Sequence, residues 1–367
     1  MKLANQKGKN LTFRFILIAL FSTWIVLING CNSENGYFTP EYASVIEGLT
    51  FSKTVSIQGA EFDRVIIQNC EFSGINGSGL DLRNVDQVII RNNIFREIHG
   101  NAIDLQGWET TSGIVIENNH IDSIDGNGVF VRENHQNVMI RGNTIQNVGL
   151  DHRASWLGMP YHGIYCQGMG CSVEGNWIGT VENPGGNAVT MRSNGKVAGN
   201  MLFGASKAGI SYYSDHPGLD GLLLIENNFI FDNSHNGIRI SSNGETENHI
   251  GKVVIRFNTI LTREKANIAV KKGTEDIDIS IFGNILIRED NNMFIFNDGR
   301  GSIYEDMNLS HNLDVGFADF QARDLHLKLG SFAEQFEVNE IEDFPELDIE
   351  GDERDSKSLN VGADQVE

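Results

Sequence analysis

The chain of 367 residues carries 49 acidic against 28 basic side chains, for a formal net charge of −21. A surface of that sign repels nucleic acid and anionic lipid, so no nucleic-acid partner is expected, and an anionic ligand needs a local basic patch or bound cations. Only three cysteines follow residue 31, too few for a scaffold built on disulfides. Two states are open for Cys166 and Cys171: a bridge between them, or two buried thiols.

The first thirty residues have the pattern of an export signal. The apolar run FILIALFSTWIVLI follows four basic residues and is too short to span a bilayer comfortably. It ends in LINGC, which resembles a bacterial lipobox with Cys31 as the residue that carries the lipid. We therefore expect a lipoprotein signal peptide over 1–30 and a tether with an N-terminal cap over 31–50. Export would leave the protein anchored to a bacterial membrane through Cys31, at the outer membrane and facing the periplasm or the cell surface.

A repeat of about 25 residues runs through the rest of the chain. Segments such as VIIRNNIF, IVIENNHI and VVIRFNTI recur with an asparagine in register, and consecutive asparagines are 24 to 33 residues apart. Each unit contains two or three short β-rich segments separated by Gly, Asn and Asp, without a helical apolar period. Asparagine suits a tight corner, and stacked asparagines can hydrogen-bond from coil to coil. The asparagines assigned to this corner are Asn69, Asn93, Asn119, Asn143, Asn176, Asn200, Asn228, Asn258, Asn284 and Asn312.

One short turn of chain per unit predicts an all-β, single-domain parallel β-helix of about ten coils over residues 51–316. Over that range the repeat resembles the right-handed parallel β-helix superfamily of the pectate lyases and related polysaccharide-active proteins. DLHLKLGSFAE and the later NVGADQ resemble the closing segment of many exported bacterial β-helix proteins, with Phe332 and Glu334 in place of the usual Pro and Ile. Residues 317–367 are therefore expected to form a C-terminal cap, which covers the last coil, and an acidic tail.

The strand after each corner maps one outer face of the solenoid, because side chains alternate along a strand. The inward positions are expected to be Ile103/Leu105, Val129/Val131, Ile164/Cys166, Val189/Met191, Ile210/Tyr212 and Ile238/Ile240. One column pointing to solvent contains Asp81, Asp104, Phe130, Tyr165, Thr190, Ser211 and Arg239, and the next contains Arg83, Gln106, Arg132, Gln167, Arg192, Tyr213, Ser241 and Lys271. With neighbours about 4.8 Å apart, a basic and aromatic patch forms from Arg132, Tyr165, Gln167, Arg192 and Tyr213.

One coil within that patch departs from the repeat. It carries the insertion GLDHRASWLGMPY, and His162 stands where other coils have a corner asparagine. Insertions in a solenoid form loops on one face, and such loops often bind ligands. Trp156 offers a flat surface for stacking on a sugar ring, and His152 and Arg153 can meet a carboxylate or sulfate. The alternative is that His162 is one more polar corner residue and that the loop has no function.

A polysaccharide lyase fits such a patch. Its reaction removes the C5 proton of a uronic acid and expels the oxygen at C4, which needs a base, an acid and positive charge near the carboxylate. His162 and Tyr165 are the candidate base and acid, in an order that the sequence leaves open, and Arg132 and Arg192 are candidates for neutralising the carboxylate. The candidates for binding an anionic polysaccharide are Trp156, His152, Arg153, Gln167, Tyr213, His216 and Arg239.

Three other activities stay open. Polygalacturonase-like proteins on this fold carry paired aspartates, a Gly-His-Gly and an Arg-x-Lys, whereas this chain has HNG, YHG and RIS, which argues against a pectin-type hydrolase. YYSDHP, residues 212–217, resembles the Asp-Pro-His segment beside a catalytic tyrosine of mannuronan C5-epimerases, with His and Pro interchanged, so epimerisation is a variant of the lyase hypothesis. A non-catalytic surface glycan-binding protein, expected to be a monomer, would need Trp156 but not the chemistry of His162 and Tyr165.

Asp81 and Asp104 suggest the remaining alternative, a glycoside hydrolase. The two aspartates would lie one coil apart, near the ~5–5.5 Å separation of a retaining pair. Stacked aspartates are equally compatible with a Ca²⁺ site or with plain solvated surface. The sequence requires no other cofactor.

Overall fold

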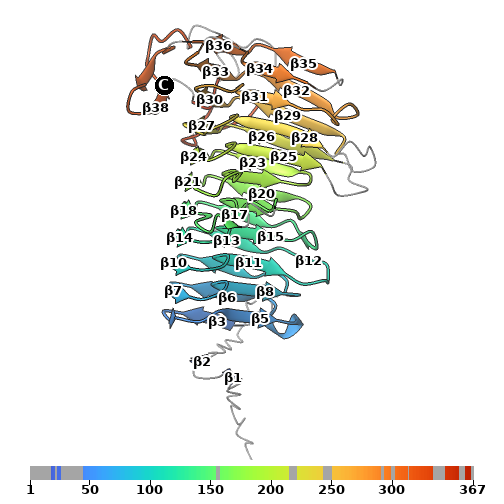
Figure 1. Cartoon of the computed structure of the whole chain (residues 1–367), viewed down its shortest axis with the longest axis vertical. Helices are drawn as coiled ribbons and strands as arrows, with labels where there is room; N and C mark the ends of the chain where they lie inside the picture. Colours follow the sequence, from blue (N-terminus) through green and yellow to red (C-terminus); the bar gives the residue numbers. More distant parts are fainter. Residues whose placement is uncertain are drawn as a thin grey trace, which may run out of the picture.

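The computed structural model describes residues 44–153, 158–214, 221–242, 250–290, 293–298, 302–312, 314–333, 344–354 and 360–364, together with the backbone of 18–20 and 23–25. Three parallel sheets form the walls of a solenoid (Figure 1). Sheet 1 consists of β3 (Ser44–Glu47), β6 (Val65–Gln68), β9 (Ile89–Arg91), β13 (Val115–Glu117), β17 (Met139–Arg141), β20 (Cys171–Glu174), β23 (Gly195–Ala198), β26 (Leu222–Glu226), β29 (Lys252–Arg256), β32 (Asp278–Phe282) and β35 (Ile303–Asp306).

The other two sheets follow in each coil. Sheet 2 consists of β4 (Thr50–Phe51), β7 (Glu71–Ile75), β10 (Ile94–Ile98), β14 (His120–Ile124), β18 (Thr144–Val148), β21 (Trp177–Val181), β24 (Met201–Ala205), β27 (Phe229–Phe231), β30 (Thr259–Thr262), β33 (Ile285–Arg288) and β36 (Leu309–His311). Sheet 3 consists of β5 (Val55–Gln58), β8 (Leu80–Arg83), β11 (Ile103–Gln106), β15 (Val129–Val131), β19 (Ile164–Cys166), β22 (Val189–Met191), β25 (Ile210–Ser214), β28 (Ile238–Ser242), β31 (Ile268–Val270) and β34 (Ile295–Asn297).

The predicted parallel β-helix is confirmed. Within the described residues, the three sheets contain 11, 11 and 10 strands, in line with about ten coils. The solenoid runs from Ser44 to His311, so its first coil begins earlier than the predicted residue 51. Between coils the chain forms small additions: the 3-10 turn Ala60–Phe62 and the paired short strands β12 (Thr111–Ser112) and β16 (His135–Gln136).

The inward and outward faces of sheet 3 follow the predicted alternation. Ile103, Ile164 and Tyr212, with the other predicted inward residues, are fully buried in one continuous apolar core. The first outward column is in register from Asp81 to Arg239, because each of its members pairs with the next across neighbouring strands. The sequence pattern therefore places the residues of this face correctly on the strands.

A ladder of buried asparagines runs along one corner of the solenoid. The Oδ1 atom of Asn176 accepts the backbone N–H and the Nδ2 group of Asn143, at 2.9 and 3.0 Å. The backbone N–H and the Nδ2 group of Asn176 in turn donate to Oδ1 of Asn200, at 2.9 and 3.0 Å. The same contacts recur in both directions, so the predicted stacking is confirmed and the corner polar groups are satisfied from coil to coil.

The two ends of the predicted ladder were wrong by a few residues. At the first coil Cys70, not Asn69, occupies the ladder position, and its N–H donates to Oδ1 of Asn93. Asn69 is the preceding corner residue in left-handed geometry, with φ 54°. At the last coil Asn308, not Asn312, receives the N–H of Asn284 at 3.1 Å. The first coil has cysteine at the ladder position, and the last coil has two asparagines close together, so the asparagine pattern alone misplaces both registers.

The C-terminal residues pack against the side of the solenoid. β37 (Phe317–Asp319) and β38 (Asp324–Leu327) form an antiparallel hairpin. The segment expected to cap the last coil contributes apolar side chains that pack on the outer face of sheet 2 at β27, β30, β33 and, at Leu309, β36. That face carries apolar residues at positions that would be polar if they faced solvent. This second core contains Phe229, Phe231, Phe257, Leu261, Ile285, Ile287, Leu309, Val315, Phe317, Leu325, Leu327, Ala333, Val361 and Ala363.

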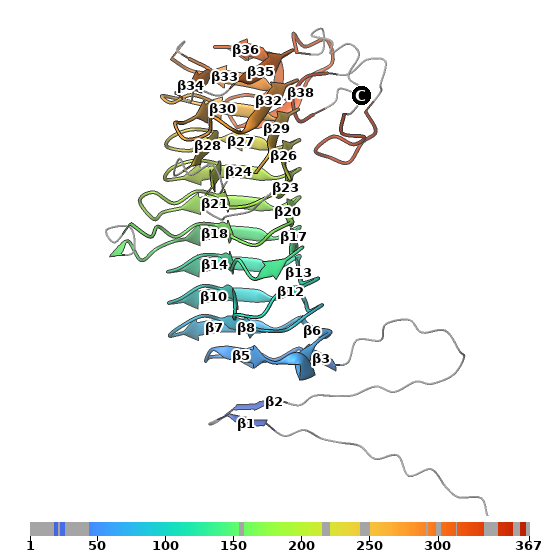
Figure 2. The ribbon, with the colours of Figure 1, turned by 90° about the vertical axis from the view of Figure 1, so that its right-hand side faces the viewer.

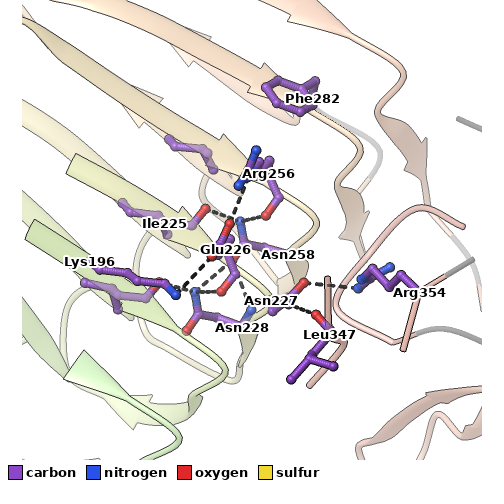
Figure 3. A network of polar contacts seen from close by, with 12 residues as sticks. Lys196, Ile225, Glu226, Asn227, Asn228, Arg256, Asn258, Phe282, Leu347 and Arg354 are labelled. Atoms are coloured by element: carbon purple, nitrogen blue, oxygen red, sulfur yellow. Dashed lines mark hydrogen bonds and ion pairs between the residues drawn. The ribbon is translucent and has the colours of Figure 1, made fainter. Parts of the chain in front are cut away.

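Polar contacts fasten the C-terminal residues to sheet 1 (Figure 3). The Nδ2 group of Asn227 donates to the carbonyl of Leu347 at 2.5 Å, and Arg354 donates to Oδ1 of Asn227 at 3.1 Å. Beside them, buried Glu226 lies between Lys196 at 3.3 Å and Arg256 at 2.8 Å. Glu226, Lys196 and Arg256 are therefore paired with one another on this outer face.

The N-terminal prediction falls mostly outside the described residues. Within the apolar run the chain forms the short antiparallel pair β1 (Ile18–Leu20) and β2 (Thr23–Ile25), and Cys31 is not among the described residues. None of the described residues belongs to a helix of the length and hydropathy that a membrane span requires. Cys166 and Cys171 are joined in a disulfide, with their Cα atoms 6.7 Å apart, and Cys70 is a buried thiol.

Candidate functional site

A cavity of about 530 Å³ opens on the outer face of sheet 3, across β15, β19, β22, β25 and β28. The described residues of the segment between β18 and β19, which belong to the predicted insertion, project from the solenoid (Figure 2). Its described end supplies Tyr161 to the wall. The cavity brings together six of the predicted site residues, which are His162, Tyr165, Gln167, Arg192, Tyr213 and Arg239.

Other predicted residues lie elsewhere. The guanidinium of Arg132 lies 5.8 Å from the ring centre of Phe130 and is not part of the cavity wall. Arg153 is bound to Asp151 by a pair of hydrogen bonds in an exposed loop, and His152 is exposed beside it. The carboxylate-neutralising role predicted for Arg132 is therefore better met by the cations that do line the cavity. Trp156 and His216 lie outside the described residues.

His162 is a corner residue and a cavity residue at once. Its backbone N–H donates to Oδ1 of Asn127 at 2.7 Å, and its Nδ1 accepts the backbone N–H of Asn187 at 3.0 Å. Nδ1 thus takes the place of the asparagine Oδ1 atom in a second ladder. Burial, with a smaller effect of the nearby cations Arg192 and Lys207, lowers the pKa of His162 to about 3. The imidazole is therefore neutral with its proton on Nε2, which makes it a hydrogen-bond donor to a ligand rather than a general base.

Replacing His162 by asparagine tests this assignment. Because the folded pKa is below the ordinary value, His162 contributes stability that is present above pH 6.5 and is lost as the pH falls toward 3. Asparagine keeps the acceptor without a titrating group, so His162→Asn should melt close to wild type at pH 7 and roughly 5 °C above it at pH 4. Circular dichroism gives the melting temperatures of both proteins at both pH values. A difference in melting temperature between variant and wild type that is the same at pH 4 as at pH 7 would contradict a neutral, buried His162.

Arg192 lies between two aromatic rings. Its guanidinium carbon is 5.5 Å from the ring centre of Tyr165 and 4.8 Å from that of Tyr213. The ring of Tyr165 also packs edge-on against His162 with centroids 4.9 Å apart, and its hydroxyl accepts from Nε2 of Gln167 at 3.1 Å. Cation–π contacts of this kind hold a guanidinium in place. The positive charge of Arg192 is therefore fixed at the floor of the cavity.

Lys207 is a cavity residue that the sequence analysis missed. It precedes β25, and its backbone N–H donates to the carbonyl of Gly186 in the coil below. Burial and the nearby charge of Arg239 lower the pKa of its ammonium. The sequence signal was its position: Lys207 immediately precedes Ala208, which occupies the corner that His162 and the asparagines occupy in other coils.

The charge of the cavity is opposite to that of the protein. Its described wall holds three cations, Arg192, Lys207 and Arg239, and no carboxylate, although the chain has 49 acidic residues. Like charges gathered at one partly buried site repel one another, and an anionic ligand relieves that repulsion. The cavity is consequently suited to a ligand that carries carboxylates or sulfates and presents a sugar-like face to the tyrosines.

Asp81 and Asp104 do not form a solvent-facing pair. Asp81 accepts two hydrogen bonds from Nε of Arg83, at 3.1 and 3.0 Å, and one from its Nη2 at 2.6 Å. Asp104 is 2 % exposed and accepts from Ser78, Asn101 and Gln106, and burial raises its pKa. The predicted exposure of both residues was wrong, because the neighbouring polar side chains fold over them. Neither lines the cavity, so the hydrolase pair and the Ca²⁺ site that they suggested gain no support from the geometry.

Within the described residues, one group of three carboxylates could hold a metal ion: Asp348, Glu350 and Asp364 in the C-terminal segment. These carboxylates already accept hydrogen bonds or form ion pairs within the protein. Asp348 Oδ1 accepts three backbone N–H groups, among them that of Gly351, and Glu350 pairs with His326. None of the three carboxylates lines the cavity of sheet 3. We therefore assign the cluster no role in the chemistry.

Comparison with known proteins bears on the fold. The sequence model described as "Right handed beta helix region" matches residues 5–178 and 108–284. No curated protein sequence matches the chain significantly. Among solved structures, the A-module of the mannuronan C-5 epimerase AlgE4 of Azotobacter vinelandii is 13% identical, with 73% of this chain and 77% of that one covered and a TM-score of 0.49.

Two further structures are similar at the same level. The Dettilon tailspike protein is 13% identical, with 71% of this chain and 61% of that one covered and a TM-score of 0.43. The periplasmic alginate epimerase AlgG is 10% identical, with 72% and 78% covered and a TM-score of 0.38. At such identities these likenesses concern the solenoid and not its chemistry.

Proposed function

Because the chain belongs to the right-handed β-helix family, we propose that it is a polysaccharide lyase, which cleaves a uronate-containing polysaccharide by β-elimination in the cavity on sheet 3. The observation that carries the proposal is the cavity wall itself, with Arg192, Lys207 and Arg239 beside three tyrosines and without a carboxylate among its described residues. A glycosidase needs two carboxyl groups at the scissile bond. The lyase reaction needs instead a base and positive charge around the substrate carboxylate.

The residues divide the work as follows. Arg192 and Lys207 bind the substrate carboxylate and stabilise the negative charge that grows on it when C5 loses its proton. Tyr165, in its phenolate form, takes that proton, and the electron pair left on C5 is delocalised into the substrate carboxylate. The pair then forms the C4–C5 double bond as the C4–O4 bond breaks, and the departing oxygen takes the proton from Tyr165. His162 donates a hydrogen bond from Nε2, and Gln167 orients the Tyr165 hydroxyl at 3.1 Å.

The products of the purified protein distinguish this reaction from its alternatives. A panel of uronate-containing polysaccharides is incubated with the protein, and three signals are measured: ultraviolet absorbance of unsaturated ends, new reducing ends, and exchange of the C5 proton with solvent deuterium. The proposal predicts absorbance and reducing ends together. Reducing ends alone would show a hydrolase, exchange without cleavage an epimerase, and binding without any of the three a glycan-binding protein.

Arg192 provides a quantitative test of carboxylate binding. Replacing it by glutamine removes a charge-assisted contact present in both ground and transition states, worth about 1.5–3 kcal/mol, so Kd for the polyuronate should rise roughly 10- to 100-fold. Arg96→Gln is the matched control, because Arg96 pairs with Glu71 on the exposed face of sheet 2. Titration calorimetry gives both affinities, and equal effects of the two substitutions would contradict a carboxylate at Arg192.

We also propose that the protein is exported and anchored to a bacterial membrane by a lipid on Cys31, at the outer membrane facing the periplasm or the cell surface. The support is the LINGC sequence after a basic and apolar segment. Cys31→Ser should release the protein from membranes or block its maturation, whereas Cys70→Ser should leave its fractionation unchanged. Membrane fractionation measures both, and a Cys31→Ser protein processed and sedimenting like wild type would contradict the anchor.

A further inference from the structure

A second cavity lies next to the first on the same face of the solenoid. It has a volume of about 480 Å³ and occupies the coils of β28, β31 and β34. Arg239 lines both cavities. The other residues of its wall that matter here are His235, Glu264, Lys265, Lys271, Arg288 and Phe296.

The second cavity is also positively charged. Among the described residues, no carboxylate lies within ion-pair distance of Lys265 or Lys271. The Nζ atom of Lys271 lies 4.0 Å from the ring centre of Phe296, and burial and the charge of Arg239 lower the pKa of its ammonium. Glu264 is the one acidic residue of the described wall. Lys271 thus lies beside an aromatic ring, as Arg192 does in the first cavity, and Lys265 lines the same wall as Lys271.

Two other basic residues of the wall have different roles. Arg288 is buried and bound to Asp290 and to the carbonyls of Glu264 and Met293, so it supports the wall. Burial, followed by the charges of Lys265, Lys207 and Arg239, lowers the pKa of His235. The cations left for a ligand are therefore Arg239, Lys265 and Lys271.

The two cavities follow one another along the solenoid axis. Ser211, Arg239, Ala269 and Phe296 are paired in register on β25, β28, β31 and β34. His235 donates its backbone N–H to the carbonyl of Lys207 in the coil below. From β19 to β34 there are five strand spacings, or about 24 Å. A single uronate cannot reach both sets of cations, whereas a chain of uronates along the axis can.

We infer that the second cavity is a further carboxylate-binding subsite, and that the ligand is a polyanionic chain several sugars long that lies along the axis across both cavities. This inference rests on the proposed function, because it extends the same site. Lys265 and Lys271 bind carboxylates of sugars remote from the scissile bond, and Arg239 contacts the chain between the two cavities. Binding at the second cavity contributes affinity for long chains and takes no part in proton transfer.

Affinity as a function of chain length tests the inference. Wild type and Lys265→Gln/Lys271→Gln are titrated with size-defined oligouronates of two to eight sugars. We expect the wild-type affinity to rise with length, and the double variant to bind the longest oligomers at least tenfold more weakly while binding the disaccharide like wild type. Lys252→Gln/Lys328→Gln removes the same charge at exposed positions elsewhere and should behave like wild type.

The result separates this inference from the proposed reaction. Equal wild-type affinity for all lengths, no binding of any oligouronate, or equal losses in the two double variants would each overturn the second subsite. If wild type binds longer oligomers more tightly and the Lys265→Gln/Lys271→Gln variant does not, the second subsite is upheld. This holds even if no unsaturated product forms, and in that case only the lyase proposal fails.

Discussion

Replacing Tyr165 by phenylalanine should lower kcat for the formation of unsaturated ends by 10²–10⁴-fold, the usual loss when a general acid or base is removed. Phenylalanine keeps the ring that packs against His162 and Arg192, so folding and the Kd for the polyuronate should change little. A large loss in kcat at constant Kd identifies an interaction made in the reaction and not in binding. Absorbance assays and calorimetry on the same preparation measure the two quantities.

The matched control is Tyr304→Phe. Tyr304 is exposed on β35, and its hydroxyl donates to Asp306 at 2.9 Å. That variant should keep the wild-type kcat. Turnover of Tyr165→Phe within a factor of about three of the control would remove Tyr165 from the proton transfer, and Tyr213, on the other side of Arg192, would then be the phenol to replace.

Replacing Asn176 by alanine should cost roughly 3–5 kcal/mol of folding free energy. Its Oδ1 accepts two hydrogen bonds from Asn143, and its Nδ2 group donates to Oδ1 of Asn200 and to the carbonyl of Ile140. Alanine leaves several buried polar groups without partners, at ~1–3 kcal/mol each. Because coils of a solenoid are stabilised by their neighbours, the loss weakens both adjacent interfaces.

Asn312→Ala is the control for that experiment. Asn312 also belongs to a repeat unit in the sequence, but the ladder passes through Asn308 in that coil. Urea unfolding should therefore show a change within about 0.5 kcal/mol, as for most surface substitutions. A decrease in the free energy of unfolding below about 1 kcal/mol for Asn176→Ala, or similar decreases for both variants, would contradict a continuous asparagine ladder that stabilises neighbouring coils.

The sequence was informative wherever one local rule decides a position. Alternation of side chains along a strand placed Tyr165, Arg192 and Arg239 on the outer face and Ile164 in the core, as the structure shows. The spacing of the asparagines predicted the length of a coil, because each coil has one such corner residue. The register failed at Asn69, where Cys70 holds the ladder position, and at Asn312, where Asn308 holds it, because hydrogen bonds to the next coil decide which residue turns inward.

The properties of the site that depend on three-dimensional surroundings were not predictable. The proton on His162 is placed by a backbone N–H of the next coil, that of Asn187. Asp104 lies under three polar side chains that alternation alone would leave in solvent. Arg132 was assigned to an outward column of sheet 3, but its guanidinium lies over the ring of Phe130. Lys207 joins the wall from a corner and not from a strand, so a map drawn from strands alone omits it.

The most direct test of the central claim is a crystal structure of Tyr165→Phe with a bound uronate tetrasaccharide. The account predicts sugar rings in the cavity of sheet 3, one carboxylate within hydrogen-bond distance of Arg192 and Lys207, and C5 of that sugar facing the position of the missing hydroxyl. The chain should continue past Arg239 toward Lys271. A tetrasaccharide bound elsewhere on the solenoid, or one whose carboxylates face away from Arg192 and Lys207, would contradict the account.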